Sequence, residues 1–100
     1  MYIIVWEFIA KAGHEEKFTK AYGPTGDWVE FFRNGEGYVR TDLLHDTGVT
    51  RRYLTIDYWK SKSAYADFRS HHSRQYEKLD ERCSAHTESE ALIGTFTVPD

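Results

Sequence analysis

Residues able to carry out chemistry recur at helical spacing near the end of the chain. His72, Tyr76, Leu79, Cys83 and His86 follow one another at intervals of four, three, four and three residues. A continuous helix would place all five on one stripe. An imidazole and a phenol that point from this stripe into an apolar pocket can move a substrate proton. The alternative is a core stripe in which the histidines bond to backbone groups, and both interpretations stay open.

Two carboxylates, Glu7 and Asp57, fall within stretches predicted as strands. Side chains alternate along a strand, so Leu54, Ile56 and Tyr58 share one side, and Tyr53, Thr55, Asp57 and Trp59 share the other. We expect the apolar set to pack on the helices, and the mixed set, with Glu7, to face away from them. Buried charges usually survive by pairing, so the sequence favours an ion-pair network that uses Arg40, Arg51 and Arg52. A catalytic carboxylate is the alternative.

The remaining polar residues favour structural roles. His71 and His72 are adjacent, so on a helix they point about 100° apart and cannot chelate together. No metal-binding motif occurs, and we expect no metal. Cys83 is the only cysteine, which excludes an internal disulfide and suggests an inert buried thiol. The charges of alternating sign after Tyr76 predict a solvated helix face, formed by Glu77, Lys78, Asp80, Glu81 and Arg82.

The elements that must position these residues follow from periodicity and breakers. Strands are predicted over residues 2–10, 37–46, 51–60 and 90–98. A helix begins at His14 and ends at Gly23, and a short one covers Asp27–Arg33. Ser61 is an N-cap for a further helix, which breaks near residues 70–73 and resumes from Ser73 to about His86. The result is an α+β fold of ferredoxin-like split βαβ order, with an extra short helix and an antiparallel sheet, in one domain over residues 1–100.

Composition and charge bear on partners and location. In the split βαβ arrangement the helices cover one sheet face, and the strands here are apolar on both faces. A bare apolar face needs a cover, so we expect a homodimer through the sheet faces. The net charge is -3 and no basic block occurs, which argues against nucleic acid and anionic membranes. The N-terminus has no basic segment followed by a long apolar run, so we expect a cytoplasmic protein.

Two segments resemble the antibiotic-biosynthesis-monooxygenase-like family. Tyr58-Trp59-Lys60-Ser61-Lys62-Ser63-Ala64-Tyr65 is similar to its strand-to-helix junction, and Lys11-Ala12-Gly13-His14-Glu15-Glu16-Lys17-Phe18 to its first strand-turn-helix, with Ala12 in place of the common Pro. The Gly23–Arg33 insertion departs from the smallest members. The resemblance implies a dimeric α/β barrel with a pocket between each sheet and its own helices.

The resemblance also implies a chemistry, namely cofactor-independent oxygenation of a small aromatic, phenolic or quinol molecule. On that basis His72 is the expected base, and Tyr76 or Tyr22 the hydrogen-bond donor. Trp6, Trp28 and Phe68 are the expected aromatic walls of a cavity that all six residues bound. No cofactor is expected, haem included, because Trp6, Phe68 and Lys78 stand where haem-degrading relatives carry Asn, Trp and His. The alternative is a non-catalytic dimeric module that binds a small ligand or serves as a scaffold.

Overall fold

A computed structural model describes residues 1–99 and contains one four-stranded antiparallel sheet in the order β2-β3-β1-β4. The strands are β1 (Tyr2–Ala10), β2 (Tyr38–His45), β3 (Arg52–Trp59) and β4 (Thr87–Thr97). β1 is rich in β-branched and aromatic residues and lies between β3 and β4, where these residues pack best. The predicted α+β class and antiparallel sheet are confirmed.

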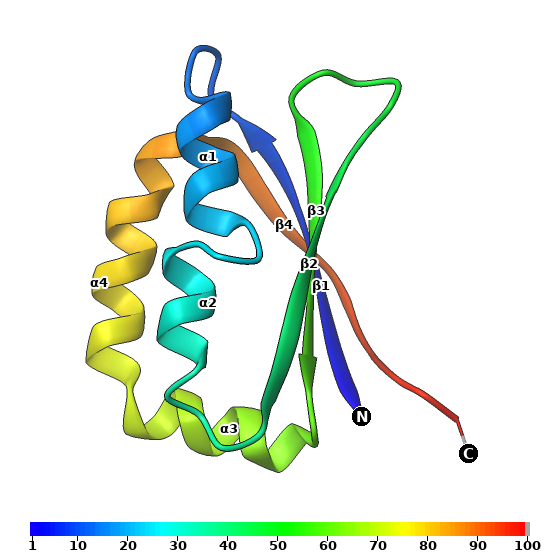
Figure 1. The fold of residues 1–100 in the computed structure, drawn as a ribbon, viewed down its shortest axis with the longest axis vertical. Coiled ribbons are helices and arrows are strands. Elements are labelled where there is room, and N and C mark those ends of the chain that lie inside the picture. The colour runs from blue at the N-terminus through cyan, green and yellow to red at the C-terminus, as the bar shows by residue number, and fades with distance from the viewer. Residues whose placement is uncertain (100) are drawn as a thin grey trace.

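All the helices lie on one side of this sheet (Figure 1). They are α1 (Glu15–Tyr22), α2 (Asp27–Phe32), α3 (Lys62–His71) and α4 (Ser73–Cys83), followed by the single 3₁₀ turn η1 (Ser84–His86). The Ser61 side chain caps α3 by accepting a hydrogen bond from the Ala64 N–H at 3.1 Å, as predicted. His72 interrupts the helical backbone between α3 and α4, at the predicted break.

The two faces of β3 are the reverse of the prediction. Tyr53, Thr55, Asp57 and Trp59 are buried beneath the helices, whereas Leu54, Ile56 and Tyr58 are half-exposed on the other side. The expectation assumed that the more aliphatic set would face the helices. Aromatic rings instead fill the space between the sheet and the helices. Trp59 packs against Phe32, Tyr38 and Phe68 in edge-on or tilted contacts. Asp57 therefore lies under the helices and not on the open face with Glu7.

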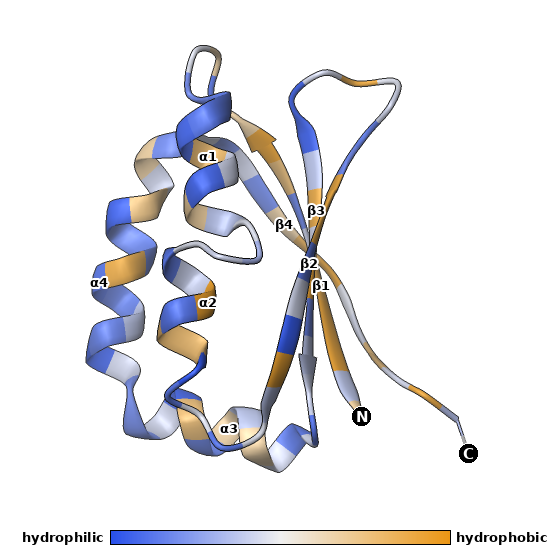
Figure 2. Ribbon diagram, viewed as in Figure 1, coloured by the Kyte–Doolittle hydropathy of each residue, from blue (hydrophilic) through white to orange (hydrophobic). Residues whose placement is uncertain are grey.

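The open face of the sheet carries an apolar patch with one ion-pair network. Figure 2 shows hydrophobic stretches along the strands, and no helix formed by residues 1–99 covers the side away from α1–α4. The patch consists of the half-exposed or exposed Ile3, Val5, Ile9, Leu44, Leu54, Ile56, Tyr58 and Phe96. Arg52 binds Glu7 at 2.6 Å and Asp46 at 2.9 Å, so the predicted pairing of Glu7 is confirmed. For Asp57 the predicted ion pair is wrong, since no ion pair among residues 1–99 includes it.

Candidate functional site

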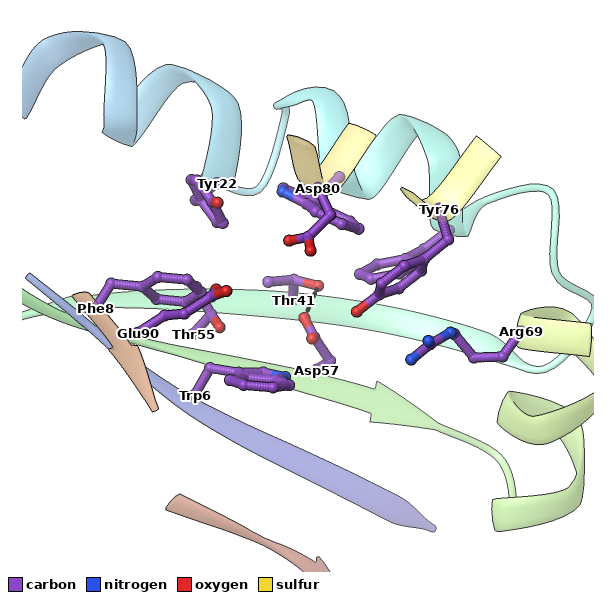
Figure 3. A pocket seen from close by; sticks show the side chains of 12 residues that line it. Trp6, Phe8, Tyr22, Thr41, Thr55, Asp57, Arg69, Tyr76, Asp80 and Glu90 are labelled. Carbon is purple, nitrogen blue, oxygen red and sulfur yellow. Dashed lines mark hydrogen bonds between the residues drawn. The ribbon is translucent and has the colours of Figure 1, made fainter. Parts of the chain in front are cut away.

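A cavity of about 240 Å³ lies between the helices and the sheet (Figure 3). Half of its lining residues are aromatic, and they come from β1, α1, α2 and α4: Trp6, Phe8, Tyr22, Trp28, Phe32 and Tyr76. The Trp28 and Tyr76 rings make an edge-to-face contact with 5.1 Å between their centroids. The centroids of the Trp28 and Tyr22 rings lie 6.2 Å apart. Walls of this kind suit a flat aromatic molecule, with a few polar groups to orient it.

Trp28 and Phe32 lie on α2, within the Gly23–Arg33 segment identified in the sequence as an insertion, and both line the cavity. Gly26 precedes α2 and packs so closely on the end of α1 that an added Cβ would lie 2.5 Å or less from two backbone oxygens. Only glycine permits this approach. Arg82 of α4 also binds Asp27 of α2 at 3.0 Å, which ties the two helices together at the surface. The segment thus forms a fixed roof over part of the cavity.

Asp57 is the most deeply buried charged group in the cavity, with 6% of its surface exposed. The Thr41 hydroxyl donates a hydrogen bond to Asp57 Oδ1 at 2.7 Å, and the Tyr38 hydroxyl lies 2.8 Å from Thr41 Oγ1. Burial raises the pKa of Asp57 to about 6, against the smaller opposite effect of the Thr41 hydrogen bond. Among residues 1–99, nothing donates a hydrogen bond to Oδ2. Asp57 therefore offers a carboxylate oxygen that titrates near neutral pH, which suits a general base.

Arg69 of α3 supplies the only cation of the cavity wall among residues 1–99. Its guanidinium carbon lies 3.6 Å from the centroid of the Tyr76 ring, and Nη1 donates to the Tyr65 hydroxyl at 3.0 Å. The cation–π contact and the hydrogen bond hold Arg69 in place at the end of the cavity (Figure 3). Burial raises the pKa values of the Tyr76 and Tyr22 phenols, so both hydroxyls remain protonated donors at neutral pH.

Two further carboxylates, Asp80 of α4 and Glu90 of β4, line the cavity without an ion-pair partner among residues 1–99. Burial raises the pKa of Glu90, and the charge of Asp80 raises it further. The assignment of Asp80 to a solvated helix face is therefore wrong. It lies four residues after Tyr76, so both side chains occupy the same side of α4, and this spacing was the available signal.

The predicted site residues divide between two places. Trp6, Tyr22, Trp28 and Tyr76 line the cavity. His72 and Phe68 do not, and this part of the predicted boundary is wrong. They lie instead in a second, more polar groove between α3 and the Asn34–Gly37 segment, with His71 and Asp67. Phe68 is buried, and its ring separates this groove from the core by packing on Trp59 and Phe31.

His86 lies beyond the end of α4, with Nδ1 3.3 Å from Nδ1 of His14. This pair lines neither the cavity nor the second groove. Within residues 1–99, no three His, Cys, Asp or Glu side chains gather in a group that could hold a metal ion. None of the helices in the same range has the length and apolar character needed to cross a membrane.

With this geometry in place, comparison with known proteins identifies the family. The sequence profile of the antibiotic biosynthesis monooxygenases matches residues 1–79. The chain belongs to this family. Membership supports a monooxygenase-like function in coarse terms and says nothing of the substrate. No curated protein sequence matches the chain.

Solved structures agree with the fold. SnoaB, a cofactor-independent oxygenase from Streptomyces nogalater, is 18% identical, with a TM-score of 0.74 over 99% of this chain and 93% of that one. PA3566 from Pseudomonas aeruginosa is 16% identical, with a TM-score of 0.69 over 99% and 94%. A further antibiotic biosynthesis monooxygenase is 18% identical, with a TM-score of 0.67 over 99% and 100%. At this identity, the likeness concerns the fold alone.

Proposed function

We propose that the protein is a cofactor-independent monooxygenase that oxidises a small aromatic phenol or quinol in the cavity between sheet and helices. The observation that carries the proposal is the Asp57 carboxylate, buried in an aromatic cavity without a cationic partner among residues 1–99. The cofactor-free character is carried over from SnoaB and from the family resemblance. The buried carboxylate, the aromatic walls and the hydrogen-bond donors of the cavity support the proposal.

The proposed reaction begins when Asp57 removes a proton from the substrate. A carboxylate with a pKa of about 6 is well matched to this task near neutral pH. The resulting anion is electron-rich and passes electrons to molecular oxygen, and a carbon–oxygen bond forms to give a hydroperoxide. Loss of water then breaks the O–O bond and leaves a carbonyl group. One oxygen atom enters the product and the other leaves as water, so O₂ is the only oxidant.

The other cavity residues stabilise the anion and exclude water. The phenols of Tyr22 and Tyr76 and the guanidinium of Arg69 are donors directed at the cavity, and preorganised donors favour a developing negative charge. Trp6 and Trp28 are the walls on which a flat ring would stack. His72, the base expected from the sequence, lies in the second groove and not in this cavity, so its substitution is the comparison for that of Asp57 in the same assay.

The experiment is an oxygen-uptake screen of purified protein against anthrones, quinols and flavonoids, without added metal or flavin. We expect one class to consume oxygen with Asp57→Asn inactive and His72→Ala close to wild type. The opposite pattern would return the role of base to His72. Ligand binding with no oxygen uptake for any class would favour the alternative, a non-catalytic ligand-binding module.

We propose further that the protein is a homodimer, with the two open sheet faces packed against each other. The apolar patch on that face includes Phe96, with 48% of its surface exposed, and Leu44, with 47%. Exposed apolar surface of this extent is typical of an interface. The Arg52 network with Glu7 and Asp46 leaves the charges on this face already paired, so their burial costs less.

A further inference from the structure

We infer that the natural ligand of the cavity is a phenol or quinol that also carries an alkylamine side chain and binds with its amino group protonated. The inference rests on the proposed role of the cavity as the substrate site, and it names the chemical class of that substrate. It is argued from the charges of the cavity wall and from the places of these charges relative to the rings.

The ionisable residues of the wall are unbalanced. Asp57, Asp80 and Glu90 are acidic, and Arg69 alone is basic among the described residues. On the opposite face of the sheet the partly buried carboxylates are each paired with an arginine, Glu7 and Asp46 with Arg52 and Asp42 with Arg40. The three cavity carboxylates have no such pair among residues 1–99. Unpaired acids beside an aromatic cavity favour a ligand that brings the missing positive charge.

The charge of Arg69 is already engaged within the protein. Its guanidinium lies over the Tyr76 ring at 3.6 Å and donates to Tyr65 at 3.0 Å. In the view of Figure 3 it enters the cavity at one end, whereas Glu90 enters at the other and Asp80 lies between Tyr22 and Tyr76. Glu90 thus marks the acidic end of the cavity and Asp80 lies nearer its middle. Against the opposing effect of burial, the Tyr65 hydrogen bond and the charge of Asp80 contribute to a raised pKa of Arg69, but Asp80 and Arg69 form no ion pair among residues 1–99.

Asp80 is electrostatically connected to most of this wall. Burial raises the pKa values of Tyr22, Tyr76 and Glu90, and the negative charge of Asp80 contributes to the increase at all three. Asp57 adds a deeply buried carboxylate whose Oδ2 accepts no hydrogen bond from residues 1–99 and which points into the same cavity. The cavity wall thus holds Asp80 and Glu90, which have no ion-pair partner among residues 1–99, and the buried carboxylate of Asp57, whose Oδ2 accepts no hydrogen bond from them.

The aromatic walls complete the recognition of an amine. An ammonium group gains from carboxylates and also from the faces of Trp and Tyr rings, and Trp6, Trp28 and Tyr22 line the cavity. An aromatic carboxylate meets the same groups with the opposite sign. A ligand with an aromatic ring and a protonated amino group fits, with the ammonium at Asp80 and Glu90 and the ring between the tryptophans.

The test is isothermal titration of the full-length protein, near neutral pH, with three naphthalene probes of equal length: 2-(1-naphthyl)ethylamine, 2-(1-naphthyl)ethanol and 1-naphthylacetate. We expect the amine to bind about tenfold more tightly than the alcohol, which corresponds to one charge-assisted hydrogen bond of modest strength, and the acid to bind most weakly. Equal affinities, tightest binding of the acid, or no binding of any probe would overturn the inference.

Asp80→Asn and Glu90→Gln should each remove most of the preference for the amine and leave the affinity for the alcohol unchanged. Glu77→Gln is the matched control, because Glu77 lies exposed on α4 outside the cavity and its substitution removes the same charge. Retention of the preference in both cavity variants would contradict the inference. If Asp80→Asn does not fold, Glu90→Gln alone decides the test, because Glu90 lies exposed on β4 and is not part of the hydrophobic core.

These outcomes are separable from those of the oxygen-uptake screen. An amine preference without oxygen consumption by any phenol would overturn the proposed oxygenase and leave the ligand class standing. Oxygen consumption with neutral phenols, together with equal probe affinities, would overturn the ligand class and leave the oxygenase standing.

Discussion

Replacement of Asp57 by asparagine should stabilise the protein at neutral pH while abolishing the proposed activity. Asp57 is 6% exposed and unpaired among residues 1–99, so the folded state bears the cost of its buried charge. The increase in its pKa from 3.8 to about 6 corresponds to about 3 kcal/mol, at about 1.4 kcal/mol for each pKa unit. Asparagine can still accept the Thr41 hydrogen bond and has no charge to bury.

The sign of the pH dependence follows from proton binding. Between about pH 4 and pH 6 the folded protein holds the Asp57 proton more tightly than the unfolded chain does. The free energy of unfolding of the wild type therefore falls as the pH rises through this window, and the variant escapes this loss. The advantage of Asp57→Asn should be near zero below about pH 4 and should reach about 3 kcal/mol above about pH 6.

Urea denaturation at a fixed protein concentration, at several pH values across this window, measures the effect. The control is Asp67→Asn on the exposed side of α3, which should change the unfolding free energy by less than about 0.5 kcal/mol. A variant that is no more stable than wild type near pH 7.5, or whose advantage does not depend on pH, would refute the argument that Asp57 is a buried charge.

Three other perturbations test the remaining arguments. Thr41→Val removes the hydrogen bond to the carboxylate, so the pKa of Asp57 should rise above about 6, as carbon-detected NMR titration of the carboxyl would reveal. Ile56→Lys places a charge on the open sheet face and should convert the proposed dimer into a monomer in sedimentation; a wild type already monomeric would refute the dimer. Gly37→Ala brings a Cβ to 2.3 Å from the Ala64 Cβ and should lower the unfolding free energy by about 1–3 kcal/mol, whereas Gly48→Ala, which meets only Asp46 Oδ1 at 3.5 Å, should cost less.

The element order could be predicted from the sequence because each boundary has a local cause. Ser61 caps α3, Gly13 takes a φ of +84° in the turn before α1, and His72 breaks the helical backbone. These signals act within a few residues and need no knowledge of the tertiary structure. The order of the strands then follows from short connections and handed crossovers.

The side to which each face of β3 turns could not be predicted in the same way. Alternation states which residues share a face, and hydrophobicity alone was used to choose the side. On β3 the choice depended on ring packing across elements far apart in sequence, in which Trp59 meets Phe32 and Tyr38. Asp57 shares a face of β3 with Trp59, so it too lies under the helices. A carboxylate expected at an interface therefore lines the cavity.

Most of the aromatic residues predicted to bound the cavity line it, whereas Phe68 and the predicted base His72 lie outside it. Trp6, Tyr22, Trp28 and Tyr76 meet in the cavity because large rings on facing elements converge on the core. Histidine was favoured as the base because its ordinary pKa lies near neutral pH. The structure reaches the same range with Asp57, whose pKa depends on burial, and burial is a property of the fold that no local pattern displays.

The single thiol of the chain offers a built-in reporter of motion. Cys83 is the last residue of α4, the helix that also carries Tyr76 and Asp80; it is 1% exposed, and burial raises the pKa of its thiol to about 11. A thiol-specific reagent can therefore reach it only when the end of α4 leaves the sheet. The rate of labelling counts these excursions in the unmodified protein. A ligand bound in the cavity between α4 and the strands should slow the labelling of Cys83, so this rate reports how often the cavity opens.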